Sequence, residues 1–338
     1  MKQSTTIFAI ISMMFILAAC GTNNAETESA PVELTDVTLQ LGWIHDYSAV
    51  PVHVALNEGF FEAEGLNVTV EAGGFDEDGN FIDTFGLVKS GEVMFGVGSA
   101  SRILQERDNG ESLVGFLSVL QRSPAVLLAL ADTGLQQPAD LEGLTVMASE
   151  EDTFKLEILM DEQGIDTESV TILPRSSFGI DPLLNGETDV LLTWIINEGV
   201  MVTESGNEAS YLIMSDYGID AYDSVYFATE ETISNNPDVV QALVNAVTAG
   251  IEFAVANPEE AIAHTISFNE ELDEEAQLRR LNAMIPLMNV PGIDAGHMDD
   301  STWTFTYNLL HDNGIIGELD VTGAYTVEYV ENVPDDSE

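Results

Sequence analysis

The distribution of apolar and polar residues predicts two successive blocks in which strands alternate with helices. Short apolar runs, which indicate strands, precede segments with apolar residues three or four positions apart, which indicate helices. In the first block the expected strands lie at 37–42, 67–70, 93–97 and 113–120, and the expected helices at 51–64, 80–90 and 100–109. In the second block the expected strands lie at 125–130, 144–148, 170–173, 189–193 and 211–214, and the expected helices at 153–163, 182–185 and 195–204. This alternation is typical of α/β sheets with crossover helices.

From about Thr229 onward the periodicity is almost wholly helical, with Asn236 as a plausible N-cap. The expected helices lie at 237–256, 273–287 and 299–312, and a further one begins at Pro258. Two α/β blocks followed by a helical tail are typical of a two-lobed clamp whose chain crosses between the lobes and returns. The predicted lobes are residues 36–124 with 229–338 (lobe 1) and residues 125–228 (lobe 2).

The amino terminus has the pattern of a bacterial lipoprotein signal. A basic residue is followed by an apolar run at 7–19, which is too short for a membrane-spanning helix of about 20 residues. Small residues precede Cys20, the only cysteine, as at a site of cleavage and lipidation. We therefore expect a signal peptide at 1–19 and a lipidated tether at 20–35 that holds an extracytoplasmic domain at the cell membrane.

The charge balance excludes several partners and sites. The chain has 338 residues, of which 59 are acidic and nine are Lys or Arg, so the formal net charge is −50, yet 45% of the residues are hydrophobic. That apolar content is typical of a folded protein with an acidic surface. A saline habitat and a composition bias of the lineage explain the acidity equally well. Phosphate binding needs clustered cations, which excludes nucleic acid. A single cysteine excludes a disulfide framework.

The sequence contains no standard catalytic or metal-binding motif. Metalloprotease, P-loop, nucleophile-elbow and CxxC patterns are all missing. The five histidines are dispersed, with none three or four residues apart, so we expect no transition metal. Asp76, Asp78 and Asn80 resemble the beginning of a calcium loop, but Gly79 comes too early and Leu87 stands where a bidentate glutamate is needed. We interpret this segment as a solvated acidic loop and expect no cofactor.

Several short motifs occur together in an order that is typical of one family. The longest is VALNEGFFEAEGLNV at 54–68, preceded by LQLGW at 39–43. The others are SGEVMFGVG at 90–98, QRSP at 121–124, PADLEG at 138–143, LNGETD at 184–189 and NPEEA at 257–261. From about residue 38 to 329 the chain resembles the periplasmic-binding-protein family that serves importers of thiamine pyrimidine precursors, sulfonates, taurine and nitrate. The residues that most resemble its pyrimidine-precursor branch, which has riboflavin-binding relatives, are Trp194, Asn197-Glu198, Asp216-Tyr217-Gly218 and Trp303.

The resemblance implies a two-lobed, type II periplasmic-binding-protein fold, with two parallel or mixed sheets flanked by helices and a hinge between the lobes. It also implies a substrate-binding lipoprotein of an ABC importer, which delivers a small heteroaromatic vitamin precursor to a permease and its ATPase. The expected ligand is a thiamine pyrimidine such as hydroxymethylpyrimidine or formylaminopyrimidine. Riboflavin, or a sulfonate, taurine or nitrate, is the alternative. We expect a monomer.

Two tryptophans and a glutamate are the main candidates for ligand binding. A flat heteroaromatic ring is held between aromatic faces and oriented by a few polar groups, and we expect Trp43 and Trp194 to supply the faces. Glu198 follows Trp194 by four residues, so one helical turn would place both on one side. Its carboxylate could accept charge-assisted hydrogen bonds from an exocyclic amine of the ligand. The alternative is two core tryptophans and a surface acid.

Further candidates lie on expected loops. Gly98 and Ser99 stand between a strand and a helix, where bare amides and the helix N-terminus could hold a ligand oxygen. A tight turn that requires glycine is the alternative explanation. Asp46 and Tyr47 follow the first tryptophan and could close the cleft. Weaker candidates are Tyr217 and Tyr226.

The scarcity of cations favours a neutral or weakly basic ligand, because a buried anionic group needs Arg or Lys. Arg122 lies near the expected lobe crossing; it is either an interlobe ion pair or, if it faces the cleft, support for an anionic ligand. Two other functions compete. Eukaryotic relatives synthesise the thiamine pyrimidine with a Lys and a His near positions 96–102 and a Cys-rich motif, which this chain does not have. A purely adhesive lipoprotein would explain the tether and the charge but not the ordered motifs.

Overall fold

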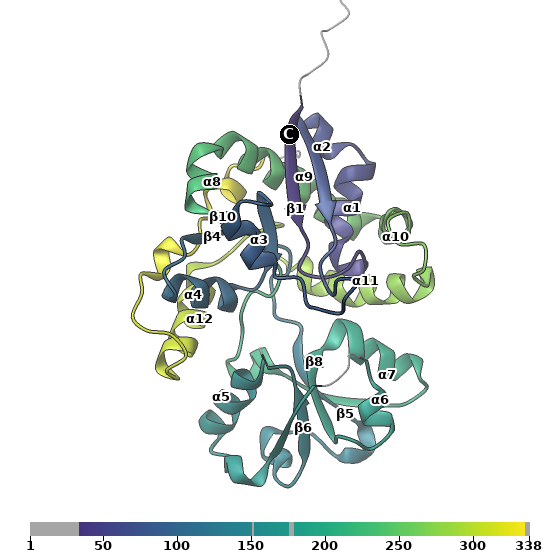
Figure 1. Cartoon of the computed structure of the whole chain (residues 1–338). Coiled ribbons are helices and arrows are strands. Elements are labelled where there is room, and N and C mark those ends of the chain that lie inside the picture. Colours follow the sequence, from purple (N-terminus) through teal and green to yellow (C-terminus); the bar gives the residue numbers. More distant parts are fainter. Residues whose placement is uncertain (1–33, 151, 176–178, 335–338) are drawn as a thin grey trace, which may run out of the picture. The chain divides into compact units, whose positions relative to one another are not determined.

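The computed structural model describes residues 34–150, 152–175 and 179–334 (Figure 1). The predicted signal peptide at 1–19, Cys20 and nearly all of the predicted tether lie outside the described residues. Of the predicted tether only Leu34 and Thr35 are described, and Thr35 already begins the first strand.

A five-stranded mixed sheet forms the first lobe. Its strands, in spatial order, are β2 (Leu66–Glu71), β1 (Thr35–Gln40), β3 (Phe95–Gly98), β10 (Val225–Thr229) and β4 (Leu113–Ser118). β1 runs parallel to β2 and β3, whereas β10 is antiparallel to β3 and β4. The strand β10 was not predicted from the sequence, and the predicted lobe 2 ended at residue 228. That boundary comes too late, because β10 pairs with first-lobe strands on both sides.

A second five-stranded mixed sheet forms the second lobe. Its strands, in spatial order, are β7 (Thr171–Pro174), β6 (Thr145–Ala148), β8 (Val190–Trp194), β5 (Ala125–Leu130) and β9 (Ala209–Ile213). β6 is parallel to β7 and β8, and β5 is antiparallel to β8 and β9. Each of these strands overlaps an apolar run from which it was predicted. The two mixed sheets with their helices confirm the predicted α/β class.

Helices connect the strands and make up most of the C-terminal third. The helices between strands are α1 (Val50–Asn57), α2 (Phe60–Ala63), α3 (Thr84–Ser90), α4 (Ala100–Asp108), α5 (Thr153–Gln163), α6 (Asp181–Leu184) and α7 (Val200–Glu204). The C-terminal helices are α8 (Glu230–Asn235), α9 (Pro237–Ala256), α10 (Pro258–Ile266), α11 (Glu274–Met288), α12 (Asp300–Asp312) and α13 (Glu328–Glu331). The bounds of α9 agree with the prediction, and those of α11 and α12 differ from it by one residue.

Three predicted helices differ from the structure for local reasons. The helix predicted at 51–64 divides into α1 and α2 at Gly59, whose φ of 75° interrupts a helix. The helix predicted at 80–90 begins only at α3, because the Asp83 side chain accepts a hydrogen bond from the amide of Gly86 and caps the helix there. The helix predicted at 195–204 begins as a π-helical turn at Ile195–Gly199 and continues as α7.

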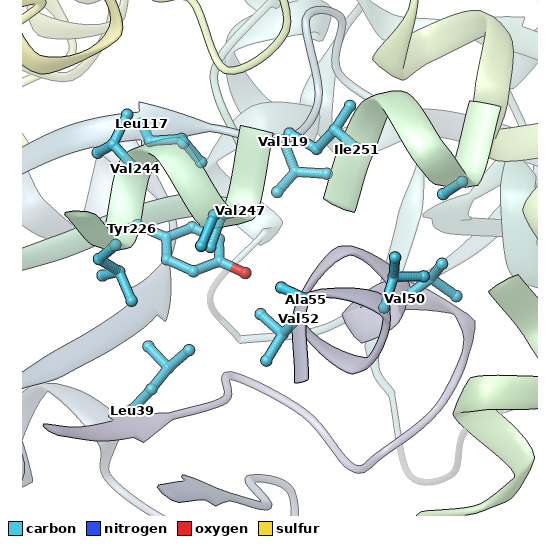
Figure 2. Packing of buried hydrophobic residues seen from close by; sticks show 14 of the residues in the cluster. Leu39, Val50, Val52, Ala55, Leu117, Val119, Tyr226, Val244, Val247 and Ile251 are labelled. Atoms are coloured by element: carbon cyan, nitrogen blue, oxygen red, sulfur yellow. The ribbon is translucent and has the colours of Figure 1, made fainter. Parts of the chain in front are cut away.

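α1 and α9 pack together over the first sheet. The buried residues of this contact, shown in Figure 2, include Leu39, Val52, Ala55, Leu117, Tyr226, Val244, Val247 and Ile251. The backbones come so close that a Cβ added at Gly250 would lie 2.1 Å from the carbonyl oxygen of Pro51. By length and composition α9 could cross a membrane, but half of its apolar window is buried within the described domain. It is the central helix of the first-lobe core.

A fully buried histidine links α1 to α10. The His53 Nδ1 lies 3.0 Å from the hydroxyl of Thr265, and its Nε2 lies 2.9 Å from Nδ1 of His45. The ring of Phe268 stacks on His53 with the centroids 4.5 Å apart. Burial, with smaller contributions from His45 and His264, lowers the pKa of His53 to about 3. The folded protein therefore holds this imidazole neutral.

We expect His53 to make stability sensitive to mild acid. Below pH about 6.5 the His53 side chain is protonated in the unfolded chain, whereas in the folded protein it stays neutral until the pH is near 3. The free energy of unfolding therefore falls as the pH falls through that interval. The slope contributed by this one group approaches ~1.4 kcal/mol per pH unit. Urea unfolding of the wild type and of His53→Gln between pH 7 and 4.5 measures it. The many carboxylates titrate in both proteins, so only the difference is attributed to His53; parallel curves would contradict the assignment.

Candidate functional site

A cavity of about 580 Å³ is lined by residues of both lobes. Much of its described wall follows the carboxyl ends of parallel strands. These wall residues are 41–43 and 46–49 after β1, 98–99 and 101–102 at the end of β3, Ser149, Asp152 and 154–155 after β6, Arg175 after β7, and Trp194, Asn197 and Glu198 at the end of β8. Ligand sites of open α/β sheets lie outside the carboxyl ends of the strands. The position of the cavity is therefore the one that the topology favours for a binding site.

Aromatic side chains make up much of the wall. They are Trp43, Tyr47, Phe81, Phe85, Phe154, Trp194 and Tyr226. Trp43 belongs to the first lobe and Trp194 to the second, so the two predicted stacking residues reach the same cavity from different sheets. Trp43 also contacts the exposed ring of Phe81, with the centroids 6.3 Å apart. Stacking of a flat ligand between these two tryptophans stays a prediction.

The charged residues of the wall form pairs. The acidic ones are Asp46, Asp83, Asp152, Glu198 and Asp223, and the cationic ones are Arg102, Lys155 and Arg175. Lys155 Nζ lies 2.9 Å from Oδ1 of Asp152 and 3.4 Å from Oδ1 of Asp223. Arg102 forms an ion pair with Glu106 at 2.7 Å. Every cation that lines the cavity thus has a carboxylate partner.

Glu198 is almost completely buried and is held by three protein donors. Oε1 accepts hydrogen bonds from Arg175 Nη2 at 2.5 Å and from the amide of Gly179 at 3.3 Å. Oε2 accepts a hydrogen bond from the hydroxyl of Thr193 at 2.5 Å. Glu198 belongs to the π-helical turn Ile195–Gly199, whereas Trp194 is the last residue of β8; both line the cavity, and their placement on one side of a helical turn stays a prediction. Acceptance of a ligand amine by Glu198 stays a prediction, and it would have to use the remaining lone pairs of the carboxylate.

The first-lobe candidates Asp46 and Tyr47 begin a short 3₁₀ turn in the cavity wall. The Asp46 carboxylate accepts a hydrogen bond from the Ser48 amide at 2.9 Å, and burial raises its pKa despite that bond. The amide of Tyr47 donates to Oε1 of Gln277 on α11 at 2.9 Å. Both residues are therefore fixed by contacts within the protein, and closure of the cleft by them stays a prediction.

Gly98 and Ser99 lie in the wall, but local structure accounts for both. Ser99 is the N-cap of α4, and its hydroxyl accepts a hydrogen bond from the Arg102 amide at 3.2 Å. A Cβ added at Gly98 would lie 2.5 Å from the ring of Phe85, which stacks on Phe227 with the centroids 4.4 Å apart. Glycine is thus required here for side-chain packing. Binding of a ligand oxygen by these amides stays a prediction.

The described wall does not include Tyr217, Trp303 or Arg122, which were singled out from the sequence. Tyr217 packs against the core of the second lobe, and Trp303 is buried in the first lobe, stacked on Tyr325. Arg122 is exposed and lies outside the wall. Conversely, Tyr226 reaches the wall although it ranked as a weaker candidate.

Several wall residues were not predicted from the sequence, among them Phe81, Phe85, Lys155 and Arg175. One signal was available: Arg175 and Lys155 are two of only nine cations in the chain, and Arg175 follows an expected parallel strand directly. The aromatic pair carried no such signal, because isolated phenylalanines are common in cores.

One cluster among the described residues has the composition of a metal site. Ligand atoms of Glu58, Glu260 and His264 lie within 4.8 Å of one another. His264 Nε2 lies 2.8 Å from Oε1 of Glu58, a hydrogen-bond contact at the surface that brings these two side chains together. None of these residues lines the cavity.

Comparisons with known proteins agree on a family and a fold. The family model described as "NMT1/THI5 like" matches residues 47–261. The formylaminopyrimidine-binding protein of Halalkalibacterium halodurans is 26% identical over 90% of this chain and 92% of its own length. The riboflavin-binding protein RibY of Chloroflexus aurantiacus is 24% identical over 98% of both. A 4-amino-5-hydroxymethyl-2-methylpyrimidine phosphate synthase of Schizosaccharomyces pombe is 22% identical over 71% of both.

Among solved structures, the periplasmic aliphatic sulphonate-binding protein SsuA of Escherichia coli superposes with a TM-score of 0.66. The match covers 85% of this chain and 91% of SsuA at 14% sequence identity. At that identity the likeness concerns the fold, which is that of periplasmic binding proteins.

Replacement of Gly98 by alanine tests the packing of the cavity wall without a ligand. The new methyl group would collide with Phe85, so we expect Gly98→Ala to lower the free energy of unfolding by ~1–3 kcal/mol. In a Phe85→Leu background the obstructing ring is gone, and the same substitution should cost less. A double-mutant cycle by urea unfolding measures the difference. Equal losses in both backgrounds would show that Gly98 is required for another reason.

Proposed function

Because the chain belongs to the NMT1/THI5 like family and is a substrate-binding protein for a small ligand, we propose that it is the extracytoplasmic component of an ABC importer. Its ligand is a small, planar, uncharged heteroaromatic compound such as a thiamine pyrimidine precursor, which it delivers to the permease and its ATPase. The observation that carries this proposal is the aromatic cavity at the carboxyl ends of strands from both lobes. Stacking on such faces is worth roughly 1–3 kcal/mol per ring.

The charges of the wall support a neutral ligand. Among the described residues, five carboxylates and three cations line the cavity, and each of these cations already faces a carboxylate. A sulfonate or nitrate would have to compete with those carboxylates while losing its own hydration, which is costly for a buried anion. Riboflavin also has a planar, uncharged ring system and is the second candidate, supported by the likeness to RibY over 98% of this chain.

The two binding proteins align over 90% and 98% of this chain at 26% and 24% identity, whereas the synthases of fission yeast and of Legionella pneumophila align over 71% and 88% of it, both at 22% identity. The described wall of the cavity contains neither His nor Cys, the side chains that the synthase function would use. Binding without turnover is therefore the favoured function. The closed form would dock on the permease, and domain closure on a ligand is the usual mechanism of such two-lobed proteins.

Substitution of the two tryptophans tests the ligand site. We expect Trp43→Leu and Trp194→Leu each to weaken binding of hydroxymethylpyrimidine or riboflavin by ~1–3 kcal/mol, because each removes one stacking face. Calorimetric titration of dialysed protein measures the affinity. Tyr217→Leu is the matched control, since that ring packs in the second-lobe core, and it should leave the affinity unchanged. If neither compound nor a wider panel of vitamins bound the wild type, the proposed function would be wrong.

The lipid anchor at Cys20 is a separate part of the proposal, supported by the apolar run and small residues that precede it. In a bacterial host the wild type should fractionate with membranes and carry acyl chains on the mature N-terminus. Cys20→Ser should move the protein to the soluble fraction without changing ligand affinity. Retention of Cys20→Ser in the membrane fraction would exclude this residue as the anchor.

A further inference from the structure

A closed hydrogen-bonded triangle occupies the second-lobe wall of the cavity. Arg175 Nη2 donates to Glu198, Arg175 Nη1 donates to the hydroxyl of Thr193 at 2.9 Å, and that hydroxyl donates to the other oxygen of Glu198. The side chains of Arg175 and Glu198 are 8% and 2% exposed. Each of the three residues also lines the cavity. A buried guanidinium and its counter-charge thus stand beside the proposed ligand.

A guanidinium in such a place is by its chemistry a receptor for planar oxyanions. Its fork of N–H donors matches carboxylate, sulfonate and phosphate groups, and its charge cannot be removed by deprotonation. In this cavity the matching oxyanion is already supplied by the protein, from the turn that follows Trp194. An incoming anion would meet the negative charge of Glu198 and would have to displace a carboxylate held by three donors.

We propose that Glu198 is a built-in counter-anion for Arg175, and that it determines the selectivity of the cavity for uncharged over anionic aromatic ligands. This inference rests on the proposed function, since it concerns the same cavity, and it specifies the ligand class. Glu198 selects by neutralising the guanidinium, and Thr193 is a positioning residue that holds the two charged groups together. Removal of the negative charge at position 198 turns this wall into a site for an anion.

The difference from direct recognition of an amine is measurable. If Glu198 only accepts hydrogen bonds from a ligand amine, Glu198→Gln weakens amine ligands and gains nothing. If Glu198 neutralises Arg175, the same substitution creates affinity for anions. Glutamine keeps the size of the side chain and one carbonyl acceptor, while the guanidinium loses the charge of the carboxylate that lies nearest to it among the described ion pairs.

Benzenesulfonate and benzenesulfonamide are the probes, because they have nearly the same shape and differ in charge. Calorimetry at low ionic strength should show that Glu198→Gln binds benzenesulfonate at least about tenfold more tightly than the wild type does. Affinity for the neutral sulfonamide should change much less. The gain should disappear in the double variant Arg175→Met/Glu198→Gln, which has neither charge.

Asp273→Asn is the matched control. Asp273 is exposed, caps α11 and lies outside the cavity wall, so the substitution removes one negative charge without changing the site. It should leave the affinity for benzenesulfonate near that of the wild type. An equal gain in Asp273→Asn would overturn the proposal, since the effect would then be one of overall charge. An unchanged or lower affinity in folded Glu198→Gln would overturn it as well.

Loss of a buried charge partner can destabilise a protein, so the melting temperature of Glu198→Gln is measured with and without benzenesulfonate. Benzenesulfonate should raise the melting temperature of Glu198→Gln more than that of the wild type, because the anion replaces the missing charge. If Glu198→Gln does not fold, Thr193→Val is the second variant, because it loosens the ion pair of Arg175 with Glu198 while both charges remain. It should show a smaller gain in affinity for benzenesulfonate, and no gain there would count against the proposal.

Failure of the wild type to bind any heteroaromatic compound would remove the proposed function. The comparison of anion affinities would still decide the role of Glu198.

Discussion

The arrangement of the cavity depends on parallel strand pairing within each sheet. Parallel strands bring their carboxyl ends to one edge, so the segments after β1 and β3, and those after β6, β7 and β8, open on a common space. Each sheet also contains one strand that runs against its parallel neighbours. These strands, β5 and β10, are the ones by which the chain enters the second sheet and returns to the first. The two crossings therefore lie beside the same edge that carries the wall residues.

A second constraint comes from the small number of cations. With 59 carboxylates in the chain, each Lys or Arg that is taken from the surface leaves it more negative. Among the described residues three of the nine line the cavity, each paired with a carboxylate, and two of these, Lys155 and Arg175, have buried side chains. Buried pairs of this kind gain little net stability over apolar residues. Their presence is better explained by the fixed positions that these pairs give to polar groups of the wall. The neighbouring aromatic rings provide apolar contact surface but no directional hydrogen bonds.

Much of the fold could be predicted from local patterns. The spacing of apolar residues indicates helices such as α9, and a continuous apolar run indicates strands such as β5. β10 was missed because a run of five residues next to a helical tail carries little periodic signal, and its place is decided by pairing with strands more than 100 residues earlier. The ion pair of Arg175 with Glu198 joins positions 23 residues apart through a π-helical turn. No spacing rule predicts such a turn. Tyr217 was chosen by resemblance alone, and its motif turned out to lie over the second-lobe core.

The two crossings are also tied to each other. The amide of Ser123 on the outgoing connection donates to Asp220 at 3.1 Å, and its hydroxyl donates to Asp223 at 2.6 Å, both on the returning one. Asp223 in turn contacts Lys155 of α5. Two connections without mutual contacts could rotate independently, whereas these two are joined by hydrogen bonds and should move together. We therefore expect the lobes to move mainly by bending at the paired connections, with little gain of backbone conformational entropy.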